Sequence, residues 1–199
     1  MTEPVVLLPG MMCDARLFGP QIEALSGTYP LMTAPIGGHD TMQDLAIEVL
    51  ANAPPRFAIA GLSMGGYVAM EVMRRAPERV SRLMLLDTTA RPDLPEQTEN
   101  RRRQMSLAEA GKFAQVAPAL YPLIVHESRL EDAALRNIVL QMAEATGPEA
   151  FIRQQQAILT RPDSRPDLPS FSCPTTVVGG AGDRLTPPDR AREMSELIP

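Results

Sequence analysis

The sequence predicts an α/β fold, a mostly parallel β-sheet with flanking helices and a second, purely helical segment inserted into it. Short apolar runs alternate with helical patterns up to about residue 89 and again after about residue 164. That alternation is typical of parallel strands joined by crossover helices. Residues 90–163 show helical patterns without a strand signal. We therefore expect a sheet core at residues 1–89 and 164–199, and a helical cap at residues 90–163.

Five short runs predict the strands of the sheet. The opening run, PVVLL, is apolar at every position, which is typical of a strand buried on both faces. The predicted strands span residues 4–8, 31–34, 57–60, 83–86 and 175–178. The carboxyl ends of parallel strands meet at one edge of the sheet, where functional groups gather. Pro9, Ser63 and Asp87 each come just after such an end.

Helices are predicted between and after these runs. Thr41 is a suitable N-cap for the second helix, and Pro77 ends the third. The predicted core helices span residues 14–25, 42–53 and 64–76, with a last one that begins near residue 187. The predicted cap helices span residues 96–110, 113–120, 130–144 and 148–159. Three prolines in residues 160–169 indicate a linker back to the sheet.

Composition limits the classes of function. The chain has 199 residues, 44% of them hydrophobic, and a net charge of −5, which fits an ordinary globular protein. A pI near 5.1 argues against nucleic-acid binding. Two cysteines, no signal peptide and no long apolar run predict a cytoplasmic protein away from the membrane. We expect a small-molecule substrate, no metal and no cofactor, and the oligomeric state is left open.

The chemically most informative stretch is GLSMG, residues 61–65, which stands between a predicted strand and a predicted helix. A turn tight enough to project a serine strains the backbone and brings neighbouring chains close. Gly61 and Gly65 remove the Cβ atoms that would clash there. Ser63 then lies at a helix N-terminus, which favours negative charge developing on a substrate. The alternative is a glycine-rich turn in which Ser63 only caps the helix.

The chain resembles the α/β-hydrolase superfamily, in its branch with a helical cap. The segments that carry the resemblance are LLPGMM, GGHD, GLSMGG, the cap and VVGGAGDRLTPP. The family order of serine, acid and histidine implies that Ser63 is the nucleophile and Asp183 the acid. Asp183 would orient the histidine, although a turn aspartate that binds its own backbone is the alternative. Asp87, which also follows a strand, is the second candidate for the acid.

The resemblance also implies an oxyanion hole made of two backbone N–H groups. One belongs to Met64, the residue after the nucleophile. The other is expected in the loop after the first strand, where Met11 is the better candidate. Pro9 departs from the His-Gly-x-Pro-type loop of the family, because it stands where the histidine often does. Met11 and its neighbour Met12 could also simply line an apolar pocket.

The general base is the missing part of this set. The family histidine follows the acid, a helix and one more strand, whereas this sequence ends at Pro199. We therefore expect the last strand, the histidine loop and the closing helix to be absent, and the 199-residue chain to be nearly inactive. His39 and His126 are the alternatives, but neither follows the family order. His39 resembles a loop histidine that is usually structural.

The sequence thus predicts a serine-type hydrolase that cleaves an ester or thioester of a small to medium apolar acyl group. Carbon–carbon bond hydrolases, lactonases and cofactor-free haloperoxidases share the fold and the triad, so they stay as alternatives. A silent binding protein that keeps the pocket without a base is a further one. The triple-arginine run at residues 101–103 is interpreted as a solvated face, and the triple-glutamine run at residues 154–156 as the polar side of a helix.

Overall fold

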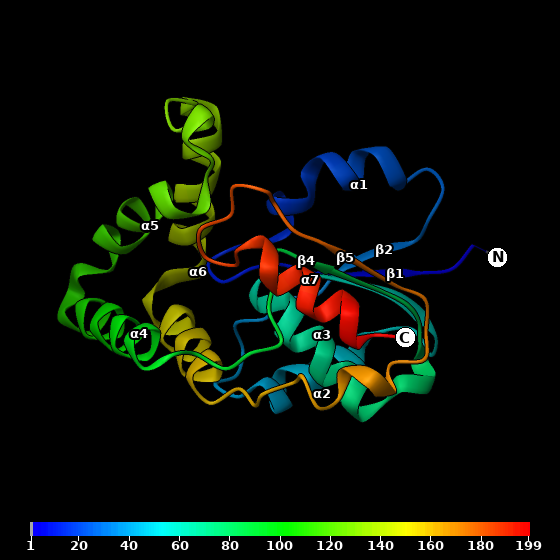
Figure 1. Ribbon diagram of the computed structural model, residues 1–199. Coiled ribbons are helices and arrows are strands. Elements are labelled where there is room, and N and C mark those ends of the chain that lie inside the picture. The colour runs from blue at the N-terminus through cyan, green and yellow to red at the C-terminus, as the bar shows by residue number, and fades with distance from the viewer. Residues whose placement is uncertain (1) are drawn as a thin grey trace.

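A computed structural model describes residues 2–199 of the chain (Figure 1). Its centre is one sheet of five strands in the order β2-β1-β3-β4-β5, with every neighbouring pair parallel. The strands are β1 (Val5–Leu8), β2 (Leu31–Thr33), β3 (Phe57–Leu62), β4 (Val80–Leu86) and β5 (Thr175–Val178). The predicted α/β class is confirmed. Four of the predicted strands keep their extent within about two residues, and β4 begins three residues earlier than expected.

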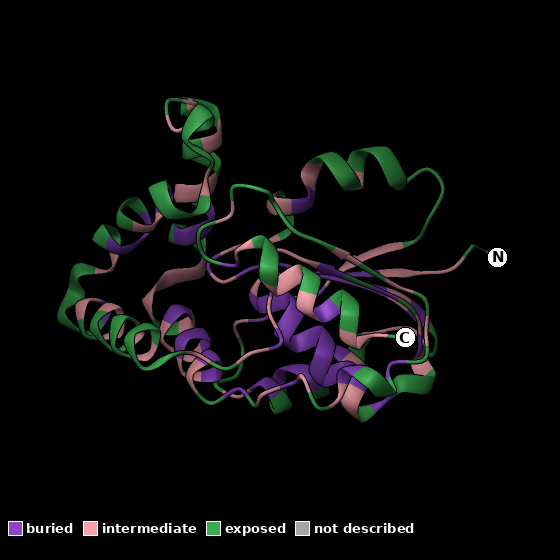
Figure 2. Cartoon of the chain, viewed as in Figure 1, coloured by how far each residue is buried: buried purple, intermediate pink, exposed green. Residues whose placement is uncertain are grey.

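Helices cover the two faces of the sheet unequally. On one face, α1 packs Ile22 beside Leu7 and Ala60. On the other face, α2, α3 and α7 enclose the main core, to which Val68 of α3 and Met194 of α7 contribute. These helices are α1 (Gly19–Leu25), α2 (Met42–Asn52), α3 (Met64–Arg75) and α7 (Pro188–Leu197). Figure 2 shows that α3 is the most thoroughly buried of them.

Helix α3 is buried along most of its length because it crosses the middle of the sheet. Its contacts are with α2 and with β1, β3 and β4. Thr41 caps the neighbouring helix α2 as expected, since its side chain accepts a hydrogen bond from the Asp44 N–H at 3.1 Å. The first residue of α3 is Met64, directly after Ser63. The buried position of α3 therefore fixes Ser63 relative to the strand ends.

Residues 90–163, called the helical insertion below, lie between β4 and β5 and gather at one end of the sheet (Figure 1). Their helices are α4 (Pro95–Leu107), α5 (Val116–Ile124) and α6 (Ala133–Leu159). Two of the predicted helices form the single element α6, which bends at Gly147, where φ is 75°, just before Pro148. Shorter helical turns are Ala15–Phe18, Pro77–Arg79, Ala108–Lys112, Phe113–Gln115, Glu127–Arg129 and Leu168–Ser170.

A cluster of buried charges ties the two ends of the helical insertion together. Asp93 lies near the start of the helical insertion, just before α4. It accepts hydrogen bonds from Arg161 at 2.7 Å and from Arg101 at 2.6 Å. Arg161 also donates to the Arg91 carbonyl at 3.0 Å. The solvated-face interpretation is therefore wrong for Arg101, because the partner that draws it inward, Asp93, lies eight residues away in a loop.

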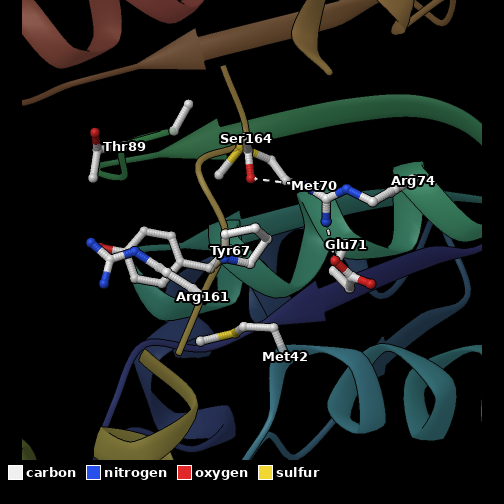
Figure 3. A pocket seen from close by; sticks show the side chains of 10 residues that line it. Met42, Tyr67, Met70, Glu71, Arg74, Thr89, Arg161 and Ser164 are labelled. Atoms are coloured by element: carbon white, nitrogen blue, oxygen red, sulfur yellow. Dashed lines mark hydrogen bonds and ion pairs between the residues drawn. The ribbon is translucent and has the colours of Figure 1, made fainter. Parts of the chain in front are cut away.

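The same junction contacts helix α3 of the core. The guanidinium of Arg161 lies 4.4 Å from the ring centre of Tyr67, a cation–π arrangement. Figure 3 shows Arg161 over Tyr67 and, farther along α3, Arg74 between Glu71 and Ser164. The cavity beside them has a volume of about 10 Å³, room for roughly one water molecule. This region is a structural joint that is too small for a substrate.

No helix within residues 2–199 combines the length and the apolar character that crossing a membrane requires.

Candidate active site

Ser63 occupies a strained turn between β3 and α3. Its φ of 52° and ψ of −113° lie outside the regions that side chains ordinarily adopt. The turn is held from β4, since the Ser63 N–H donates to the Leu86 carbonyl at 2.9 Å and Thr88 Oγ1 donates to the Ser63 carbonyl at 2.8 Å. The Ser63 hydroxyl is partly exposed and has no hydrogen-bond partner among residues 2–199. The backbone is thus fixed while Oγ is left free.

The glycines around Ser63 are required by close backbone contacts. A Cβ on Gly65 would lie 2.1 Å from the Leu8 carbonyl oxygen, and one on Gly61 would lie 2.3 Å from the Gly65 carbonyl oxygen. Gly66 is equally confined, because a Cβ there would lie 2.5 Å from Thr88 Oγ1. The turn therefore packs against the end of β1, which brings the loop after β1 beside Ser63.

That loop brings the backbone N–H of Met11 close to the serine turn in the chain's path. A Cβ on Gly10 would lie 3.7 Å from Ser63 Cβ, so the loop passes directly beside the nucleophile candidate. The Met12 N–H donates to Gln154 Oε1 at 3.0 Å, and the Cys13 N–H donates to the Gly10 carbonyl at 3.2 Å. The Met11 N–H has no acceptor among residues 2–199. The N–H of Met64, in the first turn of α3, is one of the donors that a helix leaves unpaired.

The two acid candidates follow adjacent strands. Asp183 Oδ1 accepts the N–H groups of Leu185 at 2.8 Å and Thr186 at 3.0 Å, and Oδ2 accepts the Thr186 hydroxyl at 2.6 Å. These bonds fix the carboxylate of Asp183 in its loop. Asp87 follows β4, between the strands that precede Ser63 and Asp183, and its Oδ1 accepts the Gly180 N–H at 2.7 Å.

The electrostatics of Asp87 differ from those of an ordinary surface carboxyl. Partial burial raises the pKa of Asp87, and the nearby Asp183 carboxyl raises it further by charge and by hydrogen bonding. The hydrogen bond from the Gly180 N–H acts in the opposite direction but does not outweigh these effects.

The two histidines have separate surroundings. His39 lies 3.6 Å from Glu48, Nε2 to Oε2. His126 is exposed in the helical insertion, between α5 and α6, and its Nδ1 is 2.8 Å from Ser128 Oγ. A Cβ on Gly182 would lie 2.8 Å from His126 Cδ2, so His126 touches the loop that carries Asp183. Neither imidazole is hydrogen-bonded to Ser63 or Asp183 within residues 2–199.

A cavity of about 260 Å³ opens on the far side of the loop after β1. Its wall is mainly apolar and comes from the loops after β1 and β2 and from α6. The residues that line it include Pro9, Cys13, Thr33, Ile36, Ala150 and Gln154. Burial raises the pKa of the Cys13 thiol to about 12, so this wall carries no reactive thiolate near neutral pH. Ser63, Met11 and Met64 are not among the lining residues, so the cavity does not include the serine turn.

Comparison with known proteins assigns the chain to a family. Residues 5–199 match the profile of the Alpha/beta hydrolase family. The chain belongs to that family. A pimeloyl-acyl-carrier-protein methyl ester esterase from Nitrosomonas europaea is 28% identical over 213 residues, which cover 98% of this chain and 83% of that protein.

Solved structures of α/β-hydrolases superpose closely on the chain. A thermophilic esterase from Thermogutta terrifontis gives a TM-score of 0.89 at 30% identity, covering 100% of this chain and 79% of the other. The enol-lactonase from Burkholderia xenovorans gives a TM-score of 0.88 at 24% identity, covering 100% and 80%. The second likeness concerns the fold alone.

For two polar residues of this α/β-hydrolase the sequence-based interpretation is wrong. Interpretation of the triple-glutamine run as the polar side of a helix is wrong for Gln154 and Gln155, which are 2% and 0% exposed. A signal was present, because Phe151 and Ile158 lie three residues before and four after Gln154, on the same helical face. A polar residue on an apolar face is expected to have a buried hydrogen-bond partner.

Proposed function

We propose that the protein hydrolyses an ester or thioester of a small to medium apolar acyl group, with Ser63 as the nucleophile. The observation that carries the proposal is the strained Ser63 turn, which leaves Oγ without a protein partner beside the loop of Met11. In α/β-hydrolases, a strained turn between a strand and a helix N-terminus projects the nucleophile. The turn at Ser63 has this form.

The proposed reaction has two halves. Ser63 Oγ attacks the acyl carbonyl, and the oxygen that becomes negative accepts the N–H groups of Met64 and Met11. Collapse of this intermediate releases the alcohol or thiol and leaves an acyl group on Ser63. Water then attacks the acyl-serine, which releases the carboxylic acid and restores the hydroxyl. Asp183 is the proposed partner of the imidazolium that carries the proton.

Proton transfer is the slow part of this scheme in the 199-residue chain. Neither His39 nor His126 is hydrogen-bonded to Ser63 in the described structure. A serine site without its base loses on the order of 10⁶ in turnover. We therefore expect the chain alone to be nearly inactive, and imidazole added to the solution to replace part of the missing function.

The substrate class is inferred from the relatives. The Nitrosomonas and Thermogutta relatives are named as esterases. Besides the substrate, water is the only partner that the scheme needs. Cys13 and Cys173 are both free thiols, which supports the cytoplasm as the place of the reaction.

The test is hydrolysis of p-nitrophenyl butyrate, with and without added imidazole, by the chain and by its Ser63→Ala variant. We expect little turnover without imidazole and a saturable increase with it, seen only when Ser63 is present. The variant also measures the reaction of imidazole with the ester in solution. Equal rates for the two proteins at every imidazole concentration would overturn the proposal and favour a binding protein with a silent site.

A further inference from the structure

The helical insertion hydrogen-bonds to Met12, in the loop after β1, through one side chain. Gln154 of α6 accepts the Met12 N–H with Oε1 at 3.0 Å and donates from Nε2 to the Ile36 carbonyl at 3.2 Å. Both bonds are buried. They join three segments that are far apart in the sequence: α6, the loop after β1 and the loop after β2.

Neighbouring residues of α6 strengthen this contact. Arg153 Nε donates to the Gly37 carbonyl at 2.9 Å. A Cβ on Gly37 would lie 3.3 Å from Ala150 Cβ, so α6 is in close contact with the loop after β2. The contacts of Ala150 and Arg153 on the same helical face leave little freedom for Gln154 to turn away. The amide is thus held against both loops.

Met12 is a residue whose backbone needs such support. Its φ of 57° is left-handed, a conformation that costs a non-glycine residue roughly 1 kcal/mol. Its N–H has one acceptor, Gln154, and Met12 is only 6% exposed, so no bulk water is at hand to replace that acceptor. The peptide plane between Met11 and Met12 is therefore fixed by Gln154, one residue away from the free Met11 N–H.

We propose that Gln154 is a positioning residue that orients the Met11 N–H toward Ser63, so that the oxyanion hole is complete only when α6 is seated on the loops. The inference rests on the proposed function for its effect on catalysis. Its structural half, control of the Met11–Met12 peptide by Gln154, stands on the hydrogen bonds alone. Gln154 acts through Met12 and does not touch the reacting atoms.

The first test measures that structural half and needs no activity. Amide exchange is followed by NMR in the whole chain labelled with ¹⁵N-methionine. The unmodified chain is compared with its Gln154→Leu and Gln154→Glu variants. Leucine removes both bonds, so the Met12 amide should exchange at least about tenfold faster. Glutamate keeps the acceptor for Met12 and should preserve its protection. Gln155→Leu is the matched control, since Gln155 is equally buried but bonds to Gln104 and Arg101 inside the helical insertion.

The second test measures the catalytic half as Ser63-dependent, imidazole-assisted hydrolysis. Gln154→Leu should lower kcat roughly tenfold, less than complete loss of an oxyanion donor, while KM changes less than about twofold. A merely structural role would instead lower the melting temperature and affect Gln155→Leu to the same degree. Unchanged Met12 exchange, or an unchanged kcat in Gln154→Leu, overturns the inference.

The two proposals fail in different ways. If the unmodified chain shows no Ser63-dependent hydrolysis, the proposed function fails, and the oxyanion role of Gln154 fails with it. If hydrolysis depends on Ser63 but Gln154→Leu keeps its kcat, only the inference about Gln154 fails.

Discussion

The carboxyl groups of Asp87 and Asp183 meet at a single backbone turn. A Cβ on Gly180 would lie 3.5 Å from Asp87 Oδ1 and 3.7 Å from Asp183 Cβ. The two residues follow β4 and β5, which are neighbours in the sheet. Burial, followed by the charge and hydrogen bonding of Asp183, raises the pKa of Asp87 above its ordinary value of 3.8. Two candidate acids therefore share one electrostatic environment.

Asp87→Asn should remove a pH-dependent destabilisation. A carboxyl whose folded-state pKa is raised binds its proton more tightly in the native state than in the unfolded one. Stability therefore falls as pH rises from the unfolded pKa, near 3.8, through the raised folded pKa. Asparagine can still accept the Gly180 N–H and carries no charge beside Asp183. We expect the variant to melt at a higher temperature at neutral pH, with the difference lost in acid.

Thermal denaturation across the acid range measures this difference, with the exposed Asp40→Asn as control. A variant that is less stable than the unmodified chain at neutral pH would show that ionised Asp87 is stabilising.

Asp93→Ala should strongly destabilise the fold. Burial of the Asp93 carboxyl alone would raise its pKa, but Arg101 and Arg161 outweigh burial and lower it, so the carboxyl is ionised and paired. Arg161 has a side chain only 5% exposed, and it would lose its charged partner. Removing one member of a buried ion pair costs about 3–5 kcal/mol.

Chemical denaturation measures the loss. Glu99→Ala removes a partner of Arg103 from a pair in which both side chains are more than two-thirds exposed, 78% and 68%, and should change stability by less than about 1 kcal/mol. Equal effects of the two substitutions would contradict the role of Asp93 as the joint between the ends of the helical insertion.

Gly65→Ala should destabilise the serine turn. The added Cβ would overlap the Leu8 carbonyl oxygen at 2.1 Å, and both partners belong to backbone that is fixed in the core. We expect a loss of at least about 2 kcal/mol and loss of Ser63-dependent hydrolysis. Gly19→Ala is the control, because Gly19 has helical φ and ψ and open space around it. That variant should be unchanged or up to about 1 kcal/mol more stable by urea denaturation.

Cys13 should resist alkylation in the folded chain. Burial, and then the charge of Asp14, raise the pKa of the Cys13 thiol to about 12, against the weaker effect of a backbone hydrogen bond from Gly10. Near pH 8 the thiolate fraction is then about one in 10⁴, so iodoacetamide should react roughly 10³-fold more slowly than with a free thiol. Mass spectrometry of the Cys13 peptide follows the reaction, and urea-unfolded chain provides the fast reference. Rapid labelling in the native state would show that the cavity wall opens readily.

The sheet and its helices could be predicted from sequence because local signals and burial agreed. The run before Pro9, the Thr41 cap and the stop at Pro77 all lie where the structure has element ends. The serine turn could be located because any such turn brings backbone segments close together, and only glycine fits at those contacts. These features depend on neighbours in the chain or on general rules of packing.

What could not be predicted depends on distant partners. Gln154 contacts Met12 across 142 residues, and Arg161 contacts Asp93 across 68. No local sequence pattern indicates which buried polar side chain will hydrogen-bond to which distant partner. Likewise, the joining of two predicted helices into α6 depends on Gly147, whose left-handed backbone lets the element bend and continue past Pro148.

The bend at Gly147 separates two parts of α6 that make different contacts. The portion after it carries Arg153 and Gln154, which hydrogen-bond to the loops after β1 and β2, whereas most residues between 133 and 141 are exposed or only half-buried. The exposed residues between 133 and 141 can therefore be exchanged for those of a relative, whereas the buried Met142 and Ala143 should be kept. Gly147 is therefore a suitable junction for chimaeric proteins that change the outer part of the helical insertion and keep the contacts of Gln154 with the loops after β1 and β2.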